Sequence, residues 1–160
     1  MRKILIPMAF LCLVGVSTVG FAQKDTNAAV AGEVIALAKA QWAAENATPP
    51  NVAEDFGSIA DDYSEFNGDY STRLDGKPLN LRLAEAGNKA TGRTIVSEMA
   101  NPRVQVYGDC AILSYNFVGM TIDKDGKTEP SRAKSTRVYC KIDGKWKLVH
   151  ANFAPDPLAH

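Results

Sequence analysis

Four alternating runs of apolar and polar residues fill the last third of the chain, residues 101–155. Residue types that favour turns separate these runs, at Tyr107-Gly108-Asp109, at Asp123 to Lys127 and at Asp143-Gly144-Lys145. Such alternation is typical of strands with one buried face, so the stretch predicts a meander of antiparallel strands. We expect these strands at about 93–106, 111–122, 133–142 and 146–153.

Helices are expected upstream, because the meander needs a cover for its apolar face. Apolar residues at three-and-four spacing, among them Val30, Val34 and Trp42, predict an amphipathic helix from Asn27 to about Ala47. Thr48-Pro49-Pro50 ends it, since proline cannot continue a helix.

Three shorter elements are expected between this helix and the meander. A second helix is predicted from Asn51 to Ala60, with Asn51 as its cap and Glu54 at the reciprocal capping position. A short strand within residues 61–69 and a short third helix over about 79–87 follow. The order of elements predicts an α+β fold with the helices on one face of a curved sheet. A length of 160 residues, 46% of them hydrophobic, suits one globular domain.

Residues 1–22 have the layout of a removable secretory signal peptide. Arg2 and Lys3 precede an apolar run from Ile4 to Val19, and small residues stand before Gln23. A membrane anchor is the alternative, but the run contains Pro7 and is shorter than the roughly 20 residues of a span. We therefore expect an exported protein, periplasmic or secreted, with no membrane attachment after cleavage. Residues 23–27 would form a mobile leader, 28–155 the domain and 156–160 a tail.

Charge and cysteine content restrict the classes of partner. Removal of residues 1–22 takes two of the 18 basic residues and none of the 18 acidic ones, which leaves a formal charge of −2. No basic patch for nucleic acid is expected from that balance. Cys110 and Cys140 remain, and in an oxidising compartment they form either a cross-strand disulfide or two buried thiols. We expect neither a metal site nor a cofactor.

Motifs in the meander resemble the nuclear-transport-factor-2-like superfamily. They are Asn101-Pro102-x-Val104-x-Val106-x-Gly108, Ala111 to Tyr115, Thr136 to Tyr139, and Asp143-Gly144-Lys145-Trp146 with Leu148 to His150. Within the superfamily the chain resembles the SnoaL-like branch and, in motif, the association (hub) domain of calcium/calmodulin-dependent protein kinase II. The resemblance covers residues 28–155. It implies a cone-shaped roll, in which a bent, mostly antiparallel sheet is wrapped by three N-terminal helices and encloses a pocket.

The resemblance also implies which side chains face that pocket. Arg137 faces the interior in hub domains, and strand alternation places Tyr139 on the same face. Hub domains carry further arginines where this chain has Phe117 and Phe153, so the implied pocket is aromatic with one cation. Trp42 lines the mouth of the cone or packs in the core. The predicted ligand-binding residues are Trp42, Tyr115, Phe117, Arg137, Tyr139 and Phe153.

Arg137 is the most informative of these residues, because a buried arginine needs an anionic partner. Two alternatives remain open. Arg137 either forms a structural ion pair with Asp62 or Glu65, or it contacts a carboxylate or phenolate of a ligand.

The superfamily includes isomerases, dehydratases, cyclases and epoxide hydrolases beside proteins that only bind or assemble, so the fold does not decide the chemistry. An enzyme would need a carboxylate with a pKa shifted by burial, and Asp62, Glu65 and the Tyr63 hydroxyl are the candidates. Asp62 alternatively ends a helix in solvent. The preferred hypothesis is an exported protein that binds a small apolar or aromatic molecule or serves assembly. The alternative hypothesis is a proton-transfer enzyme.

The opposite face of the sheet is predicted to carry a mixture of polar and apolar groups, Asn116, Cys140, His150 and Asn152 among them. Members of the superfamily commonly pack such faces together. The resemblance therefore implies a homodimer formed through the sheet.

Overall fold

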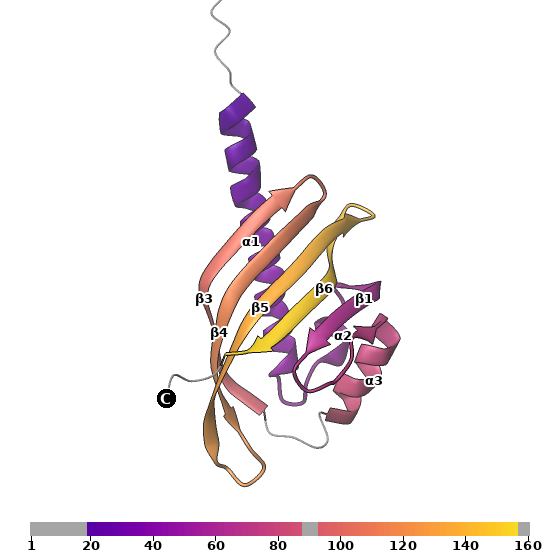
Figure 1. Cartoon of the computed structure of the whole chain (residues 1–160), viewed down its shortest axis with the longest axis vertical. Helices are drawn as coiled ribbons and strands as arrows, with labels where there is room; N and C mark the ends of the chain where they lie inside the picture. The colour runs from indigo at the N-terminus through magenta and orange to yellow at the C-terminus, as the bar shows by residue number, and fades with distance from the viewer. Residues whose placement is uncertain (1–18, 88–92, 157–160) are drawn as a thin grey trace, which may run out of the picture.

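The computed structural model describes residues 19–87 and 93–156, and within them the α+β architecture is confirmed (Figure 1). Helix α1 (Val19–Glu45) begins earlier than predicted, and its first turns extend beyond the sheet. Val34 and Ala38 on this helix are fully buried against the sheet, as the apolar spacing predicted. The expected cleavage ahead of Gln23 falls within α1 and remains a prediction. No helix in the described ranges is long and apolar enough to cross a membrane.

Helix α2 (Val52–Asp55) is a single turn, so the prediction of a helix as far as Ala60 was wrong. The predicted cap is correct, because Asn51 Oδ1 accepts a hydrogen bond from the Glu54 backbone N–H at 3.2 Å. The helix stops because the chain immediately joins the sheet: Ile59 pairs with Leu148, and the Leu148 N–H donates to the Ser58 carbonyl at 2.8 Å. Tertiary pairing here outweighs the local helical pattern.

Six strands form one sheet in the order β2-β1-β6-β5-β4-β3. Strand β1 (Ile59–Asn67) pairs in parallel with β6 (Lys145–Pro155), and every other neighbouring pair is antiparallel. The short strand β2 (Leu74–Asp75) leads into helix α3 (Lys77–Gly87). The predicted meander is confirmed as β3 (Arg93–Tyr107), β4 (Cys110–Ile122), β5 (Thr128–Ile142) and β6. β5 begins earlier than predicted because the β4–β5 hairpin stays paired to Thr128 and projects from the body (Figure 1).

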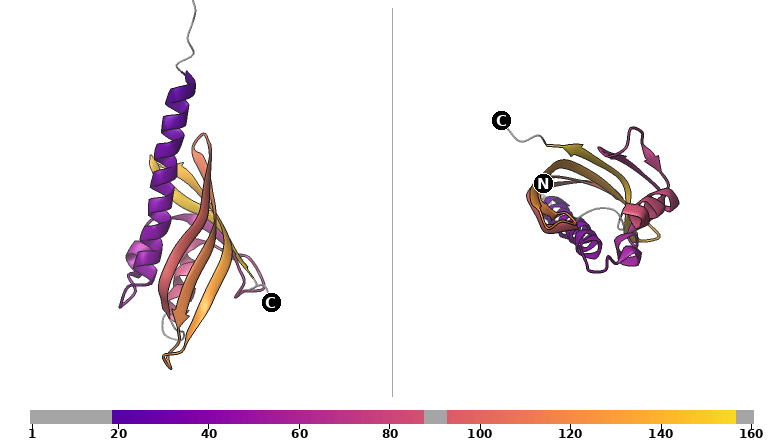
Figure 2. Two further views of the ribbon diagram at one scale, coloured as in Figure 1. Left: turned by 90° about the vertical axis from the view of Figure 1, so that its left-hand side faces the viewer. Right: turned by 90° about the horizontal axis from the view of Figure 1, so that it is seen from below.

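The sheet curls around the helices, as the view from below shows (Figure 2). A bulge between Ala100 and Arg103 of β3 contributes to this bend, and Asn101 has a positive φ of 51° there. Pro102 fits at this point because β3 is an edge strand, where a missing backbone donor is tolerated. The curvature leaves a concave inner face toward the helices and a convex outer face.

Alternation along the strands sorts side chains between the two faces, as predicted. The inner face buries Leu113, Tyr115, Arg137 and Ala151, while neighbouring residues of the same strands stay partly exposed on the outer face. Trp146 is buried in the core, which agrees with a packing role for this residue.

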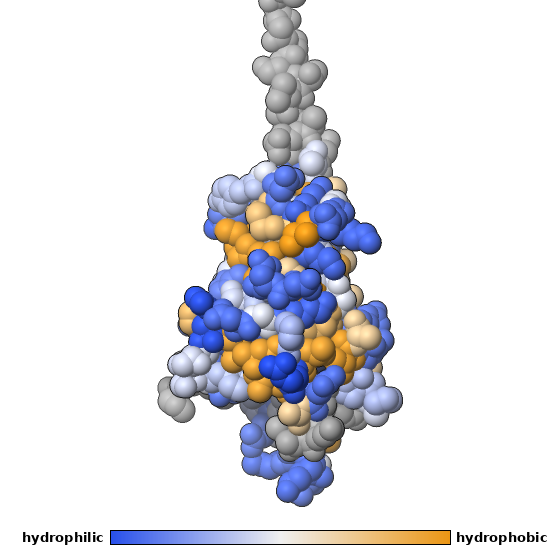
Figure 3. Space-filling view, turned by 90° about the vertical axis from the view of Figure 1, so that its right-hand side faces the viewer, coloured by the Kyte–Doolittle hydropathy of each residue, from blue (hydrophilic) through white to orange (hydrophobic). Residues whose placement is uncertain are grey.

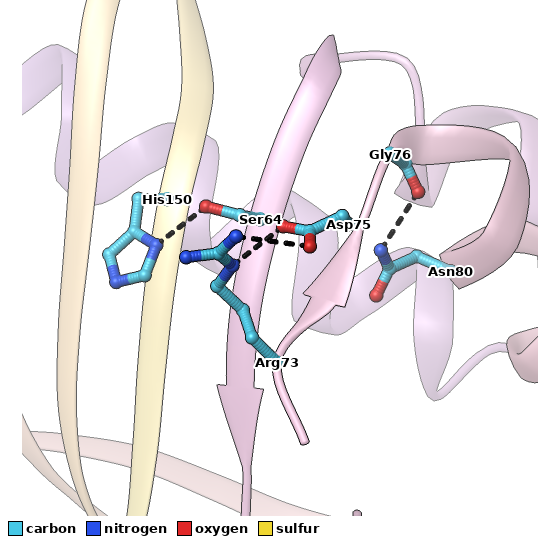
Figure 4. Close-up of polar contacts among 6 residues, drawn as sticks. All are labelled: Ser64, Arg73, Asp75, Gly76, Asn80 and His150. Atoms are coloured by element: carbon cyan, nitrogen blue, oxygen red, sulfur yellow. Dashed lines mark hydrogen bonds and ion pairs between the residues drawn. The ribbon is translucent and has the colours of Figure 1, made fainter.

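The outer face carries a disulfide and several polar contacts. Cys110 and Cys140 are directly opposed on β4 and β5, with Cα atoms 4.1 Å apart, and of the two alternatives the disulfide is the one that forms. His150 Nδ1 shares a hydrogen bond of 2.9 Å with Ser64 Oγ across β6 and β1 (Figure 4). Nearby, Arg73 Nε donates to Asp75 at 2.7 Å, and both side chains are exposed.

On the side of the molecule that carries β1 and α3, hydrophobic residues gather in two bands with hydrophilic residues between them (Figure 3). The outer face also exposes large apolar side chains. They are Phe66, Val96, Val118 and Met120.

Candidate functional site

A cavity of about 600 Å³ lies between the inner face of the sheet and the helices. Side chains from every described helix and strand line it, so the whole domain shapes this one space. Its wall combines aromatic rings with ionisable groups. The polar side chains discussed below are Gln41, Glu45, Asp55, Glu65 and Arg137.

Arg137 is the buried cation of this cavity, with 4% of its surface exposed. Its Nε donates to the Tyr115 hydroxyl at 2.9 Å, and its Nη1 donates to Gln41 Oε1. The guanidinium also lies over the Phe153 ring, 5.1 Å from the centroid. Among the described residues, no carboxylate oxygen lies within 4.0 Å of Arg137. The predicted ion pair with Asp62 or Glu65 is therefore absent from this part of the chain.

Aromatic rings form the apolar part of the wall. Trp42 of α1 meets Tyr115 and Phe117 of β4 edge to face, with centroids 5.5 and 5.3 Å away. Gly119 allows the Phe117 ring to fold back along the strand, because a Cβ there would lie 2.7 Å from Phe117 Cζ. These contacts fix the rings and leave room beside Arg137.

Asp55 lies in the cavity wall at the end of α2, and only 8% of it is exposed. Burial raises the pKa of this carboxyl to about 6, and the charge of Glu65 adds to the rise. A hydrogen bond from Gln41 and the charge of Arg137 oppose it. The net effect holds the pKa of Asp55 above its ordinary value, because burial outweighs the two opposing interactions.

Glu65 is held as an acceptor of two hydrogen bonds. Tyr63 Oη donates to its Oε2 at 2.7 Å, and Asn67 Nδ2 donates to its Oε1 at 2.9 Å. Burial, followed by the charge of Glu65, raises the pKa of Tyr63, so Tyr63 remains a donor. Desolvation and the charge of Asp55 also raise the pKa of Glu45, although water offsets part of this effect because Glu45 is exposed at the rim.

The cavity brings together most of the side chains that the sequence singled out. Of the predicted ligand-binding residues, Trp42, Tyr115, Phe117, Arg137 and Phe153 line it, as do the catalytic candidates Tyr63 and Glu65. Whether they bind or act on a ligand stays a prediction.

Two predicted residues lie elsewhere. Tyr139 is buried outside the cavity wall, and within the described residues its hydroxyl has no hydrogen-bond partner. Asp62 is exposed on β1 and does not line the cavity, because Tyr63 and Glu65 occupy the inward positions of that strand.

Sequence reasoning missed Gln41, Glu45 and Asp55 as site residues. Each interrupts an apolar helical stripe: Gln41 and Glu45 belong to the stripe of Ala38 and Trp42, and Asp55 to that of Val52, Phe56 and Ile59. A polar residue at a position of the apolar stripe is the signal in the sequence that could have identified them. Over the described residues, no group of three or more histidine, cysteine, aspartate or glutamate side chains is arranged to hold a metal ion.

Comparison with known proteins agrees with this architecture. The structure is similar to the association domain of Caenorhabditis elegans calcium/calmodulin-dependent protein kinase II, with 18% identity and a TM-score of 0.67 over 81% of this chain and 98% of that one. It is also similar to a nuclear-transport-factor-2-like protein of unknown function from Pseudomonas putida, with 20% identity and a TM-score of 0.68 over 82% and 90% of the two chains. A hub homology domain from Chlamydomonas reinhardtii has 23% identity and a TM-score of 0.66, over 80% of this chain and 99% of that one.

These identities establish a shared fold, and the sequence match establishes the family. Residues 70–157, more than half of the chain, match the calcium/calmodulin-dependent protein kinase II association domain. The chain therefore belongs to the calcium/calmodulin-dependent protein kinase II association domain family and has the nuclear-transport-factor-2-like fold.

Proposed function

We propose that this protein is an exported binding protein for a small apolar or aromatic molecule, held in the cone with an acidic or carbonyl oxygen against Arg137. The observation that carries the proposal is a buried guanidinium that borders an open cavity and has, among the described residues, no carboxylate within 4.0 Å. A guanidinium offers five N–H donors, and Tyr115 and Gln41 account for the hydrogen bonds described. An ionised acid group of the ligand would supply the missing anionic partner, and a carbonyl oxygen would supply a further hydrogen-bond acceptor.

The wall around Arg137 supports an aromatic or apolar ligand body. Trp42, Phe117 and Phe153 present ring surface to the cavity. A volume of about 600 Å³ is within the range of small-molecule sites, which bury most of a ligand against apolar walls and orient it with a few polar groups.

Substitution of the arginine tests this function. Native mass spectrometry of the purified wild-type protein should detect a co-purifying small molecule, and Arg137→Met should abolish it. Arg82→Met, on the exposed surface of α3, is the matched control and should retain it. Equal occupancy in wild type and Arg137→Met, with both variants folded by circular dichroism, would overturn the proposal.

Export is part of the proposal. The Cys110–Cys140 bond supports it, since disulfides persist in oxidising compartments and are rare in the cytosol. Cell fractionation should recover a processed chain that begins near Gln23 outside the cytoplasm. Recovery of the full-length chain in the cytoplasm would contradict this part.

Self-association through the outer face is the proposed quaternary arrangement. Membership of an association domain family favours it, and so do the exposed apolar side chains Val118 and Met120 on that face. Light scattering after size exclusion should give at least a dimer, and Met120→Glu should shift the population toward monomer. If the molar mass of Met120→Glu equals that of the wild type, the surface around Met120 is not part of the self-association interface.

Proton transfer, in an isomerase, dehydratase or cyclase, is a second candidate function. It is favoured by Asp55, a buried carboxyl in the cavity with a pKa of about 6, which suits a general base near neutral pH. The Tyr115 hydroxyl and Arg137 lie on the same cavity wall and would stabilise a developing oxyanion. Deuterium exchange into small ketones, followed by NMR, should be lost in Asp55→Asn and retained in the exposed control Asp61→Asn.

A further inference from the structure

Opposite charges stand in one row across the inner face of the sheet. Glu65 of β1 pairs with Ala151 of β6, and Ala151 pairs with Arg137 of β5. Directly paired residues point to the same face, so Glu65 and Arg137 face the cavity on either side of a small alanine. Two strand spacings separate their backbones, about 10 Å.

These two side chains could reach each other over Ala151, but each is held by other partners. Tyr63 and Asn67 occupy both oxygens of the Glu65 carboxylate. Arg137 is held by Tyr115 and Gln41 and lies over Phe153. A fixed cation and a fixed anion therefore border the same cavity without pairing with each other.

Carboxyl groups outnumber guanidinium groups in the cavity wall. Asp55 and Glu45 line the same cavity as Glu65, and the three carboxyls repel one another. A ligand with only a negative charge would satisfy Arg137 but would add to this repulsion. A ligand with only a positive charge would satisfy the carboxylates and leave Arg137 without an anion. A ligand with both charges meets both requirements.

We propose that the cavity selects a small zwitterion, an amino acid or related amino-carboxylate, with its acid group at Arg137 and its ammonium group at Glu65 and Asp55. This inference rests on the proposed binding function and names the class of its ligand. The rings of Trp42 and Phe117 would receive an apolar or aromatic side chain of that ligand.

Three probes that share one ring separate the alternatives. They are phenylalanine, which is a zwitterion, 2-phenylethylamine, which is a cation, and 3-phenylpropionate, which is an anion. In isothermal titration calorimetry with the whole protein, phenylalanine should bind at least about tenfold more tightly than either single-charge probe. If 3-phenylpropionate binds most tightly, the cavity does not select a zwitterion, although Arg137 would still bind the acid group of the ligand. If the amine binds most tightly, the inference also falls, and if none binds at millimolar concentration, the binding function falls with it.

The Glu65→Gln variant tests the ammonium end separately. It should weaken phenylalanine about tenfold or more while leaving 3-phenylpropionate as tight or tighter, because only the former presents a positive group to that carboxylate. Glu85→Gln, an exposed position on α3, is the matched control. An equal loss for both probes would mean that Glu65 only supports the cavity structurally, and this result would overturn the assignment.

Proton linkage gives a second readout that a structural role would not move. The groups that act electrostatically on Asp55 are Gln41 and Glu45 of α1, Glu65 of β1 and Arg137 of β5. A bound ammonium favours the ionised form of Asp55, whereas a bound carboxylate alone disfavours it. Near pH 6, titrations in buffers of different ionisation enthalpy should show net proton release with phenylalanine and net uptake with 3-phenylpropionate. Proton uptake with phenylalanine would contradict an ammonium group near Asp55.

Discussion

Arginine side chains on the two faces of the sheet differ in their burial and in their partners. On the exposed side of the molecule, Arg73 has a carboxylate partner at close range, with Nε and Nη2 donating to the two oxygens of Asp75 at 2.7 and 3.1 Å (Figure 4). On the inner face, Arg137 is buried and its described hydrogen-bond partners are neutral, Tyr115 and Gln41. The well-formed ion pair thus lies where water screens it, and the buried cation lies where a partner would matter most.

This contrast shows that close charge geometry and energetic importance are separate properties. An exposed pair gains little because water solvates both groups already. A buried cation that lacks a nearby anion costs several kcal/mol of desolvation, and neutral hydrogen bonds repay only part of it. The buried Arg137 therefore costs the inner face stability, whereas the exposed Arg73–Asp75 pair changes stability little.

Truncation of a buried residue on the inner face should have the largest effect on stability. Leu148 is fully buried, so Leu148→Ala should lower the free energy of unfolding by about 2 to 5 kcal/mol. Val118→Ala on the outer face, 37% exposed, should cost well under about 1 kcal/mol. Urea denaturation of both variants measures the difference, and similar losses would remove the distinction between the faces.

Loss of the disulfide should have the next largest effect, and it tests whether the outer face contributes to stability at all. Cys110 and Cys140 are 30 residues apart, and a closed loop of that size predicts a loss of about 3 to 4 kcal/mol in Cys110→Ala/Cys140→Ala. Reduced wild-type protein should match the double variant. If reduction leaves the unfolding midpoint unchanged, the bond adds nothing to the folded state.

Asp55→Asn should stabilise the protein, and only above a definite pH. The folded-state pKa of about 6 lies above the ordinary value of 3.8, so the folded protein binds this proton more tightly than the unfolded chain does. Stability from this group is present at low pH and is lost as pH rises from about 4 through about 6. The variant should therefore gain up to about 3 kcal/mol over wild type by pH 7 and almost nothing at pH 4.

Unfolding curves of both proteins across that range test the prediction. A difference between variant and wild type that does not change with pH would show that Asp55 titrates normally in the folded protein.

Removal of the exposed ion pair should have the smallest effect. Arg73→Ala should leave the urea midpoint unchanged within error, despite two short hydrogen bonds to Asp75. A clear loss of stability, especially one that salt abolishes, would show that this pair is worth more than its exposure suggests.

The meander was predictable from the sequence because its signals are local. Alternation and turn residues define each hairpin, and Asp143 and Gly144 adopt the positive φ angles, 51° and 75°, that a tight turn requires. The end of α2 was not predictable, since the residues after it pair with β6, a strand almost ninety positions away. The same reason hid the row of Glu65, Ala151 and Arg137, which exists only through the register of three strands.

The aromatic lining residues of the candidate site and its buried arginine were predictable from the sequence. Family resemblance and alternation indicated Tyr115, Phe117 and Arg137. Asp55 and Gln41 were not predicted as site residues, because a single polar residue on an apolar stripe is usually assigned to the edge of the stripe. Such residues belong to the site only because the packed domain buries them in the cavity wall, and local sequence does not show that packing.

The parallel pairing of β1 with β6 has a consequence for how the protein folds. β3, β4 and β5 can pair through short hairpins without any distant segment. β1 pairs with β6, the last strand of the domain, and cannot take its place in the sheet before β6 has formed. Contacts between such distant segments close large loops and form slowly. Because Arg137 and Glu65 meet the same cavity only across β6, a chain that lacks its C-terminal strand would have hairpins but no pocket. A ligand in this cavity would therefore bind only after β6 has paired, and it would stabilise the folded state over the unfolded chain.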